Sequence, residues 1–369
     1  MFFSFDIYCI FRIGDSMNNN DFMNMFNKFD SNNDDKKITD IKNIPSSNSI
    51  NNSIEIQRDY PKTLFDIKAK LEELRLLRDS ISGKDFSIKD EINELTSYLS
   101  EGIHLDEIFY HREIMDSIIT LIGPYGFDKD FVLDNLSNMT GKVCPMEFLG
   151  TGKAQALRTY IDMDIDFFEY DENGRVVGVP DSKKDFYKYV VTHEFFHKLS
   201  SYKNGYDDVM VMGDALLEGF TDMFAHLASG NNTDKSDLYD FPVQVCSMFT
   251  EMIGMDKVLD DYINKTGNFP NLKNLFMECG LDESRFSEFR GTLDSVISGV
   301  SRDKKSGISP SEWGITEKNS SLDFLRDNII IPYCQNHPDK VEGILDKFNS
   351  LFNDMGYSCS REDIKTSQK

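Results

Sequence analysis

Residues 193–197 read His-Glu-Phe-Phe-His, and the spacing of the two histidines requires a helix if both are to bind one metal ion. There His193 and His197 lie one turn apart on one face, so both imidazoles can reach a single metal ion. Glu194 then lies about 100° around the helix, where its carboxylate can hold a water on the metal without ligating the metal. The fold must therefore keep a helix here and turn this face toward further ligands.

The flanking sequence predicts that helix. Pro180-Asp181-Ser182 supplies a start signal, and Asp185 follows Ser182 at the spacing of a capping box. The helix is expected to end near Gly205. The histidines extend an apolar stripe rather than a solvated face, and the stripe consists of Phe186, Val190, His193 and His197.

A second helix is predicted from Asp214, as N-cap, to Ser229-Gly230. It carries Glu218 and, four residues later, Asp222 on the same face. One of these carboxylates can ligate a metal while the other accepts the second N–H of a ligand histidine. Three protein ligands leave the fourth tetrahedral position open for water, as in catalytic rather than structural zinc sites.

From His193 to Gly230 the chain resembles the gluzincin branch of the zincin metallopeptidases, the group that includes thermolysin. The segment Leu-Glu-Gly-Phe-Thr-Asp, residues 217–222, is similar to the Glu-Gly-x-Thr-Asp segment of many poorly characterised bacterial zincins. The resemblance implies one zinc ion per chain, hydrolysis of a peptide or protein substrate, and a general base at Glu194. The zinc ligands that it implies are His193, His197 and Glu218, with Asp222 orienting a histidine.

The tyrosine that stabilises the transition state in this family has no diagnostic motif here. Tyr206, in the loop between the two helices, is the candidate by position, although an ordinary loop tyrosine is the alternative. Tyr202 and Tyr239 are weaker candidates. His226 lies roughly 12 Å along the helix axis from Glu218, too far to be a ligand of the same metal.

The charge and hydropathy of the chain exclude some classes of binding partner. The chain has 40 basic and 63 acidic residues and a net charge of −23, which repels nucleic acid and anionic lipid. No apolar run has the length of a membrane span. Six scattered cysteines predict reduced thiols. A cytoplasmic location is the default expectation, with secretion by another route as the open alternative. The oligomeric state is left open.

Four segments are expected along the chain. Residues 1–58 include an Asn-rich, low-complexity stretch and are predicted to be disordered. Their apolar beginning lacks the basic region and cleavage pattern of a signal peptide, and Met17 is an alternative start. The other three segments are a helical N-terminal region at 59–150, a zincin core at 151–235 and a helical C-terminal subdomain at 236–369.

The predicted fold class is mainly α (α+β), with a zincin-like metallopeptidase core and a small hairpin or sheet before the histidine helix. Helices are expected at 63–99 as a hairpin, at 105–122 and at 128–138. Residues 157–179 alternate in polarity around Asn173-Gly174, which predicts a β-hairpin. Zincins carry a substrate-binding edge strand in this part of the chain, and a purely structural hairpin is the equal alternative.

Two other functions remain open at this stage. The zinc site could serve structure or partner binding on a zincin-like fold without peptidase activity. Alternatively, the two histidines could face the core of a metal-free helical scaffold.

Overall fold

The computed structural model of the chain describes residues 60–80, 86–146, 154–156, 159–200, 215–230, 239–264 and 268–366. Helices make up most of these residues, so the mainly α class predicted from the sequence is confirmed. The segment expected to be disordered, 1–58, lies outside the described residues. Gly205, Tyr206 and Asp214 also lie outside them.

The first helices match their predictions. Helices α3 (Leu64–Ser80) and α4 (Phe86–Glu101) form the expected helical hairpin. Helices α5 (His111–Ile122) and α6 (Lys129–Leu136) follow, separated by the short η2 helix (Gly123–Tyr125). Helix α5 begins later than predicted because strand β1 and the left-handed backbone of Tyr110, with φ 58°, precede it.

A four-stranded sheet joins residues 59–150 to residues 151–235, which are predicted as separate segments. Its strands are β1 (Ile103–Leu105), β2 (Thr140–Cys144), β3 (Ala154–Ala156) and β4 (Tyr160–Asp164), in the order β1-β2-β4-β3. Strands β2 and β4 are parallel, and the other two pairs are antiparallel. The sequence does not predict β1 and β2, because they are short and Lys142 breaks the apolar pattern of β2. Lys142 is nevertheless buried, beside Asp162 at 3.1 Å.

The predicted hairpin is present around Asn173-Gly174, where Gly174 has φ +74°. Its strands, β5 (Glu169–Tyr170) and β6 (Val176–Gly178), form a separate two-stranded sheet after the η3 helix (Ile165–Phe167). The hairpin therefore does not supply an edge of the four-stranded sheet. That sheet has β1 and β3 at its edges, and β3 contacts the histidine helix.

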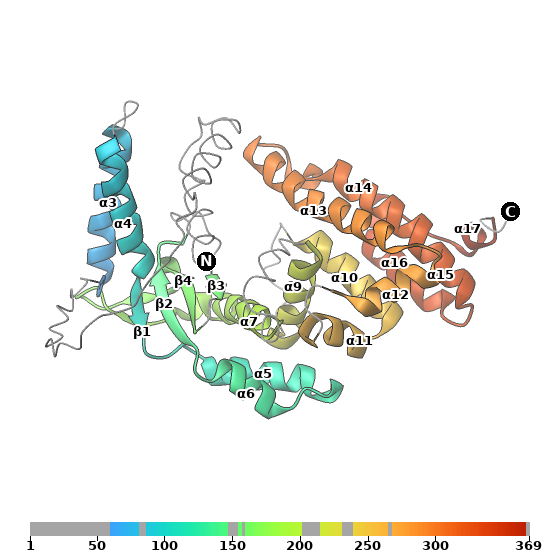
Figure 1. Cartoon of the computed structure of the whole chain (residues 1–369), viewed down its shortest axis with the longest axis horizontal. Coiled ribbons are helices and arrows are strands. Elements are labelled where there is room, and N and C mark those ends of the chain that lie inside the picture. The colour runs from blue at the N-terminus through green and yellow to red at the C-terminus, as the bar shows by residue number, and fades with distance from the viewer. Residues whose placement is uncertain are drawn as a thin grey trace, which may run out of the picture.

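The two helices of the motif form as predicted and lie between the strands and the C-terminal helices (Figure 1). Helix α7 (Lys184–Ser200) follows the short η4 helix (Asp181–Lys183), and α9 (Ala215–Ser229) ends at Gly230 with φ +66°. Helix α7 packs on α9, which contacts α10 and α13 on its other sides.

The rest of the described chain is helical, as predicted, with breaks at Gly280 and Gly307 in the left-handed region. Among the described residues, no helix combines the length and the apolar character that crossing a bilayer requires. No disulfide joins the cysteines that the structure describes. The C-terminal elements are α10 (Asp240–Ile253), α11 (Met255–Leu259), η5 (Asp260–Asn264), α12 (Pro270–Glu278), α13 (Glu283–Lys305), η6 (Pro310–Glu312), α14 (Ile315–Phe324), η7 (Leu325–Ile330), α15 (Ile331–Asn336), α16 (Val341–Phe352), η8 (Asn353–Met355) and α17 (Arg361–Thr366).

Candidate metal centre

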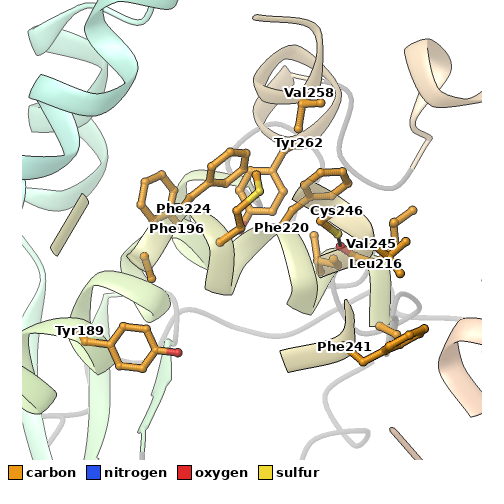
Figure 2. Close-up of a cluster of buried hydrophobic side chains, with 14 of the residues drawn as sticks. Tyr189, Phe196, Leu216, Phe220, Phe224, Phe241, Val245, Cys246, Val258 and Tyr262 are labelled. Atoms are coloured by element: carbon orange, nitrogen blue, oxygen red, sulfur yellow. Dashed lines mark hydrogen bonds between the residues drawn. The ribbon is translucent and has the colours of Figure 1, made fainter. Parts of the chain in front are cut away.

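Buried aromatic rings fix how α9 faces α7. Phe196 of α7 packs on Phe224 of α9 at 5.5 Å between ring centroids, and Phe224 meets Tyr262 at 5.1 Å. Figure 2 shows these three rings gathered together with Phe220. Their burial holds α9 in one rotation about its axis, since turning the helix would expose large apolar rings.

Gly219 lets α9 approach α10 closely. A β-carbon at this position would lie 2.8 Å from Cys246 Sγ and 2.8 Å from the carbonyl of Pro242. Because the second contact is with backbone, it cannot be relieved by a side-chain rotation. Gly219 therefore sets the distance between the two helices directly beside Glu218, a role that the motif alone did not reveal.

Asp294 of α13 holds the first turn of α9. Its Oδ1 accepts a hydrogen bond of 2.8 Å from the backbone N–H of Ala215, which has no partner within its own helix. The sequence predicts Asp214 as the N-cap, but that residue lies outside the described part of the chain. A side chain 79 positions along the sequence thus fixes the end of α9 that carries Glu218.

His193, His197 and Glu218 converge on one point. The two Nε2 atoms are 3.0 Å apart, and each is 3.4 Å from Oε2 of Glu218. Ligand atoms around a tetrahedral zinc ion, at zinc–nitrogen distances near 2.05 Å, are separated by about 3.3 Å. The spacing and the chemistry of these three donors therefore fit zinc. Within the described residues, they are the cluster of three His, Cys, Asp or Glu side chains arranged to hold a metal.

The second nitrogen of each histidine has a partner on α9. Nδ1 of His193 lies 3.0 Å from Oδ1 of Asp222, which is 2% exposed. Nδ1 of His197 lies 3.5 Å from the hydroxyl of Thr221, at the limit of a hydrogen bond. Protons on the Nδ1 atoms leave both Nε2 lone pairs free to ligate a metal.

The charged groups of the site shift one another's pKa values. Burial acts to lower the pKa of His193, but hydrogen bonds to Asp222 and Glu218 outweigh burial and raise that pKa to about 10. Burial acts to raise the pKa of Glu218, yet the charge of His197 and hydrogen bonds from both histidines hold it well below its usual range. The position of Glu218 in the first turn of α9 also favours its anionic form.

Glu194 and Tyr239 lie beside this cluster. Glu194 is buried on α7 between the two histidines, and its negative charge acts on both His193 and Tyr239. The ring of Tyr239 is nearly parallel to that of His193, at 6.3 Å and 17°. Burial, followed by the negative charges of Glu218 and Glu194, raises the pKa of Tyr239 above its usual range.

The remaining predicted site residues fall into two groups. Tyr206 and Tyr202 lie outside the described residues, so their roles stay predictions. His226 is absent from the three-ligand cluster and instead lies 3.7 Å from Oδ2 of Asp222. Other contributors were not predicted. They are Gly219, Asp294, Thr221, Tyr262 and Tyr189, whose hydroxyl donates to Asp222, and of these only Gly219 and Thr221 lie within the 217–222 segment of the motif.

Comparisons of this chain with protein-family models, curated proteins and solved structures give no match. The resemblance of residues 193–230 to gluzincins therefore depends on the motif itself.

Proposed function

We propose that this protein is a zinc-dependent peptidase with a zincin-like core, which hydrolyses peptide bonds in a peptide or protein substrate. One observation carries the proposal: the Nε2 atoms of His193 and His197 and Oε2 of Glu218 lie 3.0–3.4 Å apart. This donor set matches the two-histidine, one-glutamate ligation of hydrolytic zinc sites, which keep one position for water or substrate.

Each residue then has a defined task. His193, His197 and Glu218 hold the zinc, which when bound acts as a Lewis acid and makes water nucleophilic near neutral pH. Glu194 accepts a proton from the attacking water and passes it to the leaving amine. Tyr239, stacked beside His193, joins Tyr206 as a candidate donor to the developing oxyanion.

Strand β3 is the candidate surface for the substrate backbone. It is an edge strand of the four-stranded sheet, and it contacts α7, the helix that carries the two histidines. An extended peptide can add to such an edge through backbone hydrogen bonds.

The test is the Glu194→Gln variant, assayed for cleavage of an unfolded protein and for zinc content. Glu194→Gln should keep its zinc and lose about 10²–10⁴-fold in cleavage rate. Glu251→Gln, at an exposed position on α10, is the matched control and should cleave normally. Full activity in a zinc-loaded Glu194→Gln protein would contradict the assignment. Zinc binding without cleavage of any substrate by the wild type would favour the structural or partner-binding alternative.

A further inference from the structure

Asp222 is a buried carboxylate with more partners than the orienting of one histidine requires. Its Oδ1 accepts hydrogen bonds from Nδ1 of His193 and from the hydroxyl of Tyr189, a residue four positions before His193 on α7. Its Oδ2 lies 3.7 Å from Nε2 of His226. Both hydrogen bonds thus converge on Oδ1, and they fix the orientation of the buried carboxylate.

Tyr189 is itself held in place by rings on two sides. It stacks on His226 at 4.6 Å and 27°, and on Phe186 at 6.2 Å and 26°. The side chain is buried, so its hydroxyl can reach Asp222 but not bulk water. A phenol has one proton to donate, and here that proton goes to the same oxygen that receives the His193 N–H.

The His197 side of the cluster is built differently. The Thr221 hydroxyl lies 2.6 Å from the hydroxyl of Tyr262 and donates to the carbonyl of Leu217 at 2.8 Å. With its only proton used there, the Thr221 oxygen accepts from Tyr262 and from Nδ1 of His197. Figure 2 shows Tyr189 well apart from Tyr262. Each histidine thus has its own tyrosine, one acting through an anion and the other through a neutral hydroxyl.

We propose that Tyr189 is a positioning residue of the metal centre: by fixing the Asp222 carboxylate, it holds His193 with Nε2 directed at the metal and so sets zinc affinity. This inference rests on the proposed zinc site. It assigns Tyr189 no contact with substrate. An ionised carboxylate that receives two hydrogen bonds is a stronger constraint on the imidazole than one free to rotate.

The test compares Tyr189→Phe with Tyr187→Phe by measuring the zinc dissociation constant in competition with a chromophoric chelator. Both tyrosines are buried on α7, but Tyr187 packs against Tyr110, Phe167 and Phe168, and its hydroxyl makes no side-chain contact with the cluster. Tyr189→Phe keeps the ring and its stacking, so circular dichroism should stay unchanged. We expect zinc affinity to fall about 10–100-fold in Tyr189→Phe and to stay within about threefold of wild type in Tyr187→Phe.

A double-mutant cycle separates positioning from general packing. In an Asp222→Ala background, Tyr189→Phe should change zinc affinity by less than about twofold, because the oxygen that accepts the Tyr189 hydroxyl proton is already gone. The visible spectrum of the cobalt-substituted Tyr189→Phe protein should also shift, which reports altered ligand geometry. Equal losses with and without Asp222, or an unchanged affinity in Tyr189→Phe, would overturn the proposal and leave the zinc site standing. A wild-type protein that binds no zinc would overturn both.

Discussion

The Nε2 atoms of His193 and His197 lie 3.0 Å apart. Two imidazoles that carry their protons on Nδ1 present lone pairs to each other at this distance and repel, and a cation between them or a proton on one of them relieves that repulsion. In the proposed zinc site, protons and zinc would therefore compete for the same place, and the carboxylate of Glu218 would favour both.

The first prediction concerns the pH dependence of stability in the metal-free protein. The pKa of His193 rises from the ordinary value near 6.5 to about 10 in the folded state, so the folded protein binds the extra proton. Its stabilising contribution should be complete below pH 6.5 and should be lost as pH rises toward 10. Urea unfolding of the chelator-treated protein measures this. The same series on His193→Gln supplies the reference, and parallel profiles for the two proteins would contradict the prediction.

The second prediction concerns the contact between α9 and α10. Gly219→Ala should cost about 1–3 kcal/mol in the free energy of unfolding, because its methyl group meets the backbone of Pro242 at 2.8 Å. Zinc affinity should fall as well, since relief of the clash displaces the turn that carries Glu218.

Gly291→Ala is the matched control for that variant. Gly291 is also inside a helix, α13, but a β-carbon there meets no atom within 4 Å. Its replacement should be neutral or stabilise by up to about 1 kcal/mol, since alanine is the better helix former. Equal effects of the two substitutions would show that close approach at Gly219 is unimportant.

The third prediction concerns the cap that comes from α13. Asp294→Ala should lower stability by about 0.5–2 kcal/mol, because the N–H of Ala215 loses its acceptor. Asp282 caps α13 itself, accepting from the N–H of Arg285 at 3.1 Å. Asp282→Ala should therefore cost a similar amount of stability. Only Asp294→Ala should also weaken zinc binding, measured by chelator competition; a normal zinc affinity in that variant would argue against a role for the cap in placing Glu218.

Local sequence signals predicted the helices and the pairing of residues at the centre. The spacing of His193 and His197 follows directly from the helical period, and Glu218 and Asp222 share a face for the same reason. The turn at Asn173-Gly174 was also predicted, because glycine adopts the left-handed backbone that the hairpin needs.

Long-range contacts could not be predicted from the sequence. The sequence does not predict strand β2, because Lys142 occupies one of its buried positions. Asp162 is recognisable as the ion-pair partner of Lys142 only once β2 and β4 are paired. Tyr189 and Tyr262 look like ordinary core aromatics, since nothing in a helical stripe tells which ring carries a hydroxyl toward a buried acceptor. Asp294 caps α9 from another helix, so no local capping pattern predicts this contact.

Metal content tests the central claim most directly. Protein purified without chelators should contain one zinc per chain by elemental analysis, and His193→Ala should lose it. His104→Ala, which alters a histidine on β1 outside the three-ligand cluster, should keep it. Zinc retained in His193→Ala, or missing from all three proteins, would contradict a metal centre at His193, His197 and Glu218.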